Sequence, residues 1–317
     1  MDKERQKKPV NDYRRKQLMF VWGWLAIPII AWAVFYWYLN LSSFVGAFQD
    51  RDGFWTLQNF KDVWVDIFYP SQFARSSSLA VGFKNTLSYF LLNICVEFPI
   101  QVVTCYFLYK QIWGYKFFRY VFYLPAIISG IVLTTVFQAF IDPDIGAIQE
   151  IVKMFNPEFQ MPALMGSPDT ATKTIMTYVL WTCVCGNMLL VCGAMNRIPV
   201  DVLEAARLDG IGPGRELISI ILPLIWPTLS TLLILTCTGF LSASGPILLF
   251  NTSAADLEIT TISYWIWDKV YATSSTGNID NGVNNLVSAA GLMLTIVAVP
   301  IILAIRKLLD LVPSVEY

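Results

Sequence analysis

Residues 196–222 read NRIPVDVLEAARLDGIGPGRELISIIL and form a polar stretch between two long apolar runs. Its charged and turn-forming residues predict two short helices joined at a bend. The apolar runs on either side are long enough, at 1.5 Å per residue, to cross a hydrocarbon core of roughly 30 Å. The stretch is therefore expected to be a compact loop that connects two membrane spans.

The composition of the 317-residue chain is that of a membrane protein. Apolar residues make up 56% of it and charged residues only 14%, which is more apolar than the usage of soluble domains. The chain has no histidine, so it lacks the commonest general base and metal ligand. The six cysteines lie inside apolar stretches and are interpreted as small hydrophobic residues, so no metal site is predicted. The balance of 22 basic and 23 acidic residues gives no indication of a nucleic-acid partner.

Six apolar segments are each long enough to span a bilayer. They cover approximately residues 18–40, 85–109, 117–140, 173–195, 223–249 and 283–305. The predicted fold class is therefore all-α, a polytopic membrane protein with six transmembrane helices. The predicted division is a basic N-terminal segment 1–17, a six-helix domain 18–305 that contains the loop 196–222, and a C-terminal tail 306–317.

Basic residues predict the orientation of the spans. Most of the 22 Lys and Arg residues fall at the N-terminus, after the second span, in the loop 196–222 and in the tail. The positive-inside rule places these segments, and both termini, in the cytoplasm. The three external connections are long and rich in aromatic residues, which is typical either of an interfacial aromatic belt or of a docking surface for an extracellular partner.

The loop 196–222 is expected to bend at its glycines. Pro199 suits the first turn of a helix, Gly210 and Gly212 can end that helix in a left-handed conformation, and Pro213 can start the next. The small residues Ala205 and Ala206 give the first helix a shallow flank that could enter a groove on a partner. Considered without any relative, a two-helix elbow is by itself only a connector, and coupling to a partner is the alternative.

The loop resembles the EAA loop of ATP-binding-cassette importer permeases. The resemblance rests on Glu204-Ala205-Ala206, Gly210, Ile220 and Leu222-Pro223. The string from Glu204 to Gly210, preceded by Asn196-Arg197-Ile198-Pro199, is similar to the sugar-permease branch that includes the maltose permease type. Further similarity lies at residues 117–119, 124–125, 142–146 and 245–246.

The resemblance implies a permease subunit, not an enzyme, in the cytoplasmic membrane of a bacterium. A cytoplasmic ATPase would contact the loop through Glu204, Ala205, Ala206, Asp209, Gly210 and Pro213. The implied partners are a second homologous permease, two ATPase subunits, an extracellular solute-binding protein and a sugar. ATP and Mg would bind to the ATPase subunits and no cofactor to this chain, which has no Gly-x-x-x-x-Gly-Lys-Ser/Thr phosphate-binding loop.

Polar residues inside the spans are candidates for a solute pathway. The candidates are Thr134, Gln138, Asn187, Thr236, Phe240 and Ser242. Uncharged donors and acceptors beside aromatic rings suit a sugar better than an ion, although Ser and Thr also join membrane helices through backbone bonds. Glu97 is expected either to contact Asn93 and Gln101, one turn away, or to serve transport.

Three rival functions differ in solute or in energy source. The first is an ATP-binding-cassette permease for another class of solute, which fixed charge in the cavity would favour. The second is an ion-coupled secondary transporter, which would work without an ATPase. An intramembrane enzyme is the weakest rival, because the spans hold neither histidine nor a pair of acids.

Overall fold

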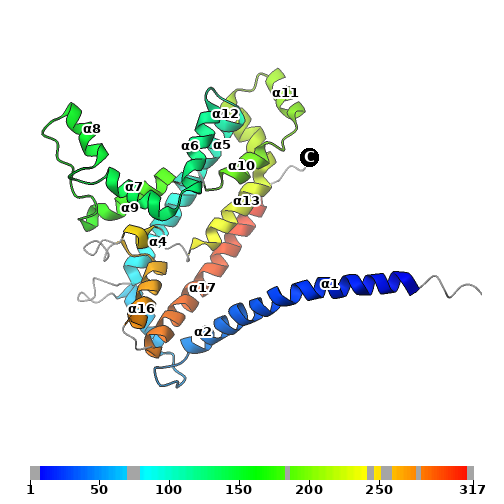
Figure 1. Ribbon diagram of the computed structural model, residues 1–317, viewed down its shortest axis with the longest axis vertical. Helices are drawn as coiled ribbons and strands as arrows, with labels where there is room; N and C mark the ends of the chain where they lie inside the picture. Colours follow the sequence, from blue (N-terminus) through cyan, green and yellow to red (C-terminus); the bar gives the residue numbers. More distant parts are fainter. Residues whose placement is uncertain are drawn as a thin grey trace, which may run out of the picture.

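The structure is a computed structural model that describes residues 8–69, 79–182, 186–240, 246–250, 259–275 and 280–312. Within these ranges the chain consists of helices and connecting turns, with one isolated β-bridge between Gln49 and Trp55. The all-α prediction is confirmed. Figure 1 shows the helices as a splayed bundle from which the N-terminal helix leads away.

The helical segments follow one another along the chain, with π-helical turns labelled η. They are α1 (Lys8–Trp32), η1 (Ala33–Tyr38), α2 (Leu39–Ala47), α3 (Gln58–Phe68), α4 (Leu79–Leu92), η2 (Asn93–Glu97), α5 (Phe98–Tyr109), α6 (Tyr115–Ile127), α7 (Gly130–Phe140), α8 (Ala147–Phe155), α9 (Pro168–Thr182), α10 (Met188–Met195), α11 (Val200–Leu208), α12 (Pro213–Glu216), η4 (Leu217–Ile221), α13 (Leu222–Thr238), α14 (Ile247–Phe250), α16 (Ile262–Ser275) and α17 (Asn281–Asp310).

Four continuous helices among the described residues are long and apolar enough to cross a membrane. They are Tyr13–Ala47, Leu79–Tyr109, Pro213–Thr238 and Asn281–Asp310. They correspond to the first, second, fifth and sixth predicted spans. The third predicted span is present as α6 and α7, which meet at an angle of 109°. The backbone is extended at Ile128 and Ser129, directly after the turn that contains Pro125, and this break separates the two helices.

The prediction of six continuous spans is not confirmed. The fourth predicted span, 173–195, covers α9 and α10, and neither is as long as the roughly 20 residues that a span needs. Residues 183–185, between them, lie outside the described residues. The fifth span was predicted to reach residue 249, but α13 ends at Thr238 and residues 247–250 form the separate helix α14.

Two π-helical turns precede prolines. The turn η2 ends two residues before Pro99, and Phe98 N donates to Asn93 O. The turn η4 ends two residues before Pro223, and Leu222 N donates to Leu217 O. A proline has no N–H and its ring crowds the carbonyl four residues earlier, so the preceding turn widens. Both helices continue through the wide turn, so the prolines do not break these two spans.

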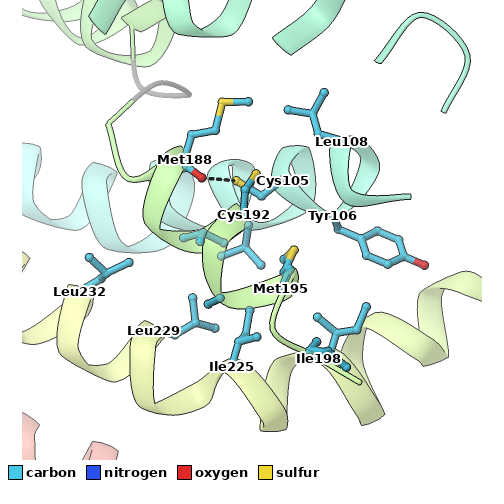
Figure 2. Packing of buried hydrophobic residues seen from close by; sticks show 14 of the residues in the cluster. Cys105, Tyr106, Leu108, Met188, Cys192, Met195, Ile198, Ile225, Leu229 and Leu232 are labelled. Carbon is cyan, nitrogen blue, oxygen red and sulfur yellow. Dashed lines mark hydrogen bonds between the residues drawn. The ribbon is translucent and has the colours of Figure 1, made fainter. Parts of the chain in front are cut away.

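One apolar cluster joins α5, α10 and α13 next to the loop. Figure 2 shows Cys105 and Leu108 of α5 facing Met188 and Cys192 of α10, with Leu229 of α13 on the other side. The Cys105 thiol lies 3.7 Å from the carbonyl oxygen of Met188. Close packing of these apolar side chains holds the three helices together beneath the loop.

A second cluster lies at the opposite end of the bundle, where α2 and α3 pack against α17 (Figure 1). The small residues Ala289 and Ala290 of α17 are fully buried there and allow close helix approach. Arg51 and Asp280 form an ion pair beside the cluster, with Arg51 Nε 3.1 Å from Asp280 Oδ1. The helix α17 therefore runs from this end of the molecule towards the end that carries α11.

The first span has little contact with the rest of the chain. No residue in its most apolar 18-residue window is buried. Its aromatic side chains are exposed, for example Trp24 at 72% and Phe35 at 71%. A contiguous apolar helix of this length cannot face water, so lipid or another protein chain must cover it.

A tight turn follows α7. Asp142 Oδ1 accepts hydrogen bonds from the amides of Ile145 (3.0 Å) and Asp144 (2.8 Å), which holds the pKa of Asp142 below its usual value. Gly146 N donates to the Asp142 carbonyl at 3.0 Å. A Cβ on Gly146 would lie 2.3 Å from the Asp142 oxygen and 2.8 Å from that of Phe140. The turn therefore has no room for a side chain at residue 146.

We predict that Gly146→Ala destabilises the protein by about 1–3 kcal/mol, because the added methyl forces the turn apart. Thermal unfolding in detergent measures the effect. Gly193→Ala is the matched control, since nothing lies within 4 Å of its Cβ position in α10. Equal unfolding temperatures for Gly146→Ala and the unchanged protein would contradict the close contact.

Candidate functional site

The loop between α10 and α13 forms the predicted pair of short helices. The first helix, α11, begins at Val200, directly after Pro199, whose ψ of 135° is extended. Pro199 therefore precedes the first turn and does not lie within it, a shift of one residue from the prediction. The second helix, α12, begins at Pro213 as predicted. Figure 1 shows α11 projecting from one end of the bundle.

Gly210 ends α11 in a left-handed conformation with φ of 70°. Ile211 N donates to Ala206 O and Gly210 N to Arg207 O, both at 3.1 Å, which is the hydrogen-bond pattern of a Schellman motif. The same prediction for Gly212 is wrong, because Gly212 has φ of −72° and precedes α12. One glycine therefore makes the bend, and a side chain there would be strained.

The two faces of α11 differ. Leu203 is buried in the apolar cluster of α5, α10 and α13, and Ala206 is also buried, whereas Glu204 and Ala205 are exposed. The predicted flank of two alanines is thus divided: Ala206 lies on the buried side of α11 and Ala205 on the exposed side. Leu208, near the end of the helix, is 89% exposed. The outer face of α11 combines apolar surface with the carboxylate of Glu204, and Asp209 and Pro213 beside it are also exposed.

An ion pair attaches the loop to the second span. Lys110 Nζ, at the end of α5, lies 2.6 and 2.8 Å from the two carboxylate oxygens of Glu216 in α12. The side chain of Glu216 is 4% exposed and that of Lys110 is 21% exposed. Tyr106 adds a second contact, because its hydroxyl donates to the Pro213 carbonyl at 3.0 Å. Sequence reasoning missed this attachment, since 106 residues separate Lys110 from Glu216 along the chain.

A cavity of about 310 Å³ lies within the bundle, between α4, α9 and the end of α13. It is lined by Thr86, Tyr89, Phe90, Asn93, Val179, Thr236, Gly239 and Phe240. Two of the predicted pathway residues, Thr236 and Phe240, are thus brought together. The rings of Phe240 and Phe90 lie 4.6 Å apart and form one wall. None of these lining residues carries a formal charge.

A chain of amide and carboxyl groups starts at the cavity. Asn93 donates to Glu97 at 2.6 Å, Gln101 donates to Glu97 at 3.1 Å, and Asn187 donates to Gln101 at 3.3 Å. The predicted contact of Glu97 with Asn93 and Gln101 is therefore confirmed. Asn187 does not line the cavity, but it links α10 to this network.

Two other predicted pathway residues lie elsewhere. The Thr134 hydroxyl donates to Gly130 O at 2.8 Å and lies 3.2 Å from the Tyr178 hydroxyl, so it joins α7 to α9. Gln138 donates to Phe250 O at 3.2 Å and lines a separate hollow near Asp142. Both side chains serve helix contacts in this structure. Ser242 lies outside the described residues.

A family model of the binding-protein-dependent transport system inner membrane component matches residues 102–312. The chain belongs to this family. The match covers the loop, its ion pair with α5 and most of the bundle. As a member of the family the chain is a multi-pass membrane component of a transport system and not itself an enzyme.

Relatives of this inner membrane component include transport permeases of known systems. The multiple sugar-binding transport system permease protein MsmF of Streptococcus mutans is 24% identical over 83% of this chain and 89% of the relative. The sn-glycerol-3-phosphate transport system permease protein UgpA of Shigella dysenteriae is 25% identical over 76% of this chain and 70% of the relative.

The fold of this component matches that of a bacterial ABC transporter involved in the import of the acidic polysaccharide alginate. A chain of that crystal structure superposes with a TM-score of 0.76 over 95% of this chain and 98% of its own length, at 19% identity. The match supports the permease fold predicted from the loop.

We predict that Lys110→Met destabilises the protein by about 3–5 kcal/mol, because it leaves the buried Glu216 carboxylate unpaired. The double variant Lys110→Met/Glu216→Leu should recover most of this loss, since no charge remains buried. Chemical unfolding in detergent measures both.

Lys153→Met is the matched control, because the Lys153–Glu150 pair is exposed and should contribute less than about 1 kcal/mol. A Lys110→Met effect no larger than that of the control would contradict the attachment of the loop to α5.

Proposed function

We propose that this chain is a membrane-spanning permease subunit of an ATP-driven, binding-protein-dependent importer whose cargo is a sugar or oligosaccharide. The observation that carries the proposal is the exposed outer face of α11, held on a loop that is attached to two spans. Family membership supports a transport role. The loop then serves as the contact with a cytoplasmic ATPase subunit, and Glu204 makes charge-assisted hydrogen bonds there.

Two continuous helices connect the loop to the cavity. The helix Leu79–Tyr109 contributes Asn93 to the cavity and, at its end, Tyr106 and Lys110 to the loop contacts. The helix Pro213–Thr238 begins in the loop and contributes Thr236 to the cavity. A displacement of α11 by the ATPase would therefore move two cavity walls together. This coupling supplies the change between inward-open and outward-open states.

The lining of the cavity favours a neutral sugar. Aromatic rings of Phe90 and Phe240 offer an apolar wall, and Asn93 and Thr236 offer hydrogen-bonding groups without charge. MsmF is named for a multiple-sugar system, which supports this class of solute. UgpA is named for sn-glycerol-3-phosphate, but a phosphate would require a cation that none of the lining residues supplies.

The complete transporter contains further subunits. We propose a second homologous permease, two ATPase subunits that bind ATP and Mg, and an extracellular solute-binding protein. A bacterial alginate ABC transporter of similar fold has been crystallised in complex with an alginate pentasaccharide-bound periplasmic protein, which supports the last of these partners. With the loop on the cytoplasmic side, both termini lie in the cytoplasm, in agreement with the distribution of basic residues.

We predict that Glu204→Ala abolishes co-purification of this chain with its ATPase subunits and reduces ATP-dependent uptake at least about tenfold, because the docking carboxylate is lost. Pull-down from detergent extracts and uptake into proteoliposomes measure the two effects. Glu150→Ala, which removes an exposed carboxylate from α8, is the matched control and should retain both. Retained ATPase binding in Glu204→Ala would count against α11 as the docking helix.

We also predict that the complete transporter takes up a sugar or oligosaccharide only when ATP is supplied inside the vesicles. Uptake is measured with a set of radiolabelled sugars and charged amino acids, with and without an ion gradient. Uptake driven by the gradient alone would support the ion-coupled rival. Uptake of a charged amino acid without any sugar would overturn the proposed cargo.

A further inference from the structure

The second span contributes a wall to the cavity that the sequence-based pathway prediction did not include. Tyr89 and Asn93 are one helical turn apart, and both line the cavity. The Tyr89 hydroxyl is covered by protein and has no hydrogen-bond partner within the part of the chain that the structure describes. An unpaired buried hydroxyl is costly, so pairing with a bound molecule is favourable once the cavity walls move and uncover it.

Glu97 fixes the orientation of Asn93. The two carboxyl oxygens of Glu97 accept from Asn93 Nδ2 at 2.6 Å and from Gln101 Nε2 at 3.1 Å. Asn93 therefore turns its amino group towards Glu97 and keeps its carbonyl oxygen as an acceptor. The Gln101 carbonyl oxygen in turn accepts from Asn187 at 3.3 Å, so α10 supports the arrangement.

The wide turn η2 places this network within the span. Asn93 and Glu97 are the first and last residues of that π-helical turn, and Pro99 follows it. Such turns are rare and are frequently found at functional sites. The carboxyl group of Glu97 thus contacts Asn93, which lines the cavity, and Glu97 is not itself among the lining residues.

The opposite wall also presents an acceptor. The Thr236 hydroxyl donates to the carbonyl of Leu232 at 3.0 Å, which leaves its oxygen lone pairs for a donor. Acceptors on two walls match a solute that donates from hydroxyl groups on both sides. A carboxylate, which only accepts, could take a hydrogen bond from the Tyr89 hydroxyl but would meet acceptors at Asn93 and Thr236 and no cation among the described lining residues.

We propose that Asn93 and Tyr89 bind hydroxyl groups of a neutral sugar during transport, and that Glu97 is a positioning residue that sets which atom Asn93 presents. This inference rests on the proposed function and deepens it, because it assigns the solute class to neutral sugars and excludes acidic ones. It places part of the recognition on the second span, next to Thr236 and Phe240 of α13.

The replacement Glu97→Gln tests the positioning role at constant size. The replacement turns one carboxyl oxygen of residue 97 into an amino group, so one of the two hydrogen bonds from Asn93 and Gln101 loses its acceptor. Both contacts can persist only if one side-chain amide rotates by a half turn. A turned Asn93 presents a donor to the cavity. We expect the KM for maltotriose uptake by the complete transporter to rise about tenfold, with the maximal rate and the unfolding temperature nearly unchanged.

The exchange Glu97→Gln/Gln101→Glu is the matched rescue. In the exchanged pair Asn93 can again donate to residue 97, which donates to residue 101, and residue 101 still accepts from Asn187. The KM should return to within about twofold of the original value. A purely structural role would show the same KM for the single and the exchanged variant, and that result would overturn the positioning role. Tyr89→Phe should raise the KM by a similar factor, because it removes the hydroxyl alone.

A second measurement does not depend on the cargo. Asn93→Cys and Leu91→Cys are treated with N-ethylmaleimide in the complete transporter, and peptide mass spectrometry locates the label among the native cysteines. Leu91 is exposed on the outer surface of α4, does not line the cavity and serves as the control. The cysteine of Asn93→Cys should react with N-ethylmaleimide in one nucleotide state of the transporter and more slowly in the other. No reaction in any nucleotide state would overturn the inference.

A set of three oligosaccharides distinguishes a failure of this inference from a failure of the proposed function. Uptake is measured for raffinose, maltotriose and trigalacturonate. Uptake of a neutral trisaccharide without trigalacturonate is the expected result. Uptake of trigalacturonate alone would overturn the inference and leave the sugar importer intact. Uptake of none of the three, with the transporter assembled and hydrolysing ATP, would overturn the proposed cargo and with it the assigned solute class.

Discussion

The buried ion pair between Lys110 and Glu216 is the contact on which the coupling of loop and cavity depends. It lies where the second span ends and the loop helix α12 begins, and Glu216 is almost completely buried. A buried carboxylate without its partner is strongly unfavourable, so the loop and the span are held together whenever the protein is folded. The hydrogen bond from Tyr106 to Pro213 fixes the same junction at a second point.

This junction connects two parts of the molecule that have different roles, the exposed loop and the cavity. At one end α11 presents Glu204 and Leu208 on an exposed face, and Gly210 ends the helix without a side chain. In the interior, the same two spans carry Asn93 and Thr236 into the cavity. Transport by this arrangement requires no chemistry on the solute. It requires that a movement at the loop shift these two walls relative to the side of the cavity formed by α9.

Local features were predictable from the sequence and distant ones were not. The helix end at Gly210 and the contacts of Glu97 with its neighbours depend on residues within one or two turns, where helical periodicity decides. The Lys110–Glu216 pair depends on two segments 106 residues apart, and no local pattern indicates it. Hydropathy located the apolar segments but not the 109° bend between α6 and α7, because apolarity does not report the extended backbone at Ile128 and Ser129. Thr134 was predicted in the pathway because a hydroxyl in a span is polar, but it bonds within and between helices.

Distance measurements between spin labels test the rigid connection of loop and span most directly. One label replaces Val200, the first residue of α11, and the other replaces Leu91 on α4, both of which are exposed. In the complete transporter, we predict the same distance distribution with and without ATP, and a broader one in the Lys110→Met variant. A clear change in distance on ATP binding in the unchanged background would mean that the loop moves without the span, and would contradict the rigid connection.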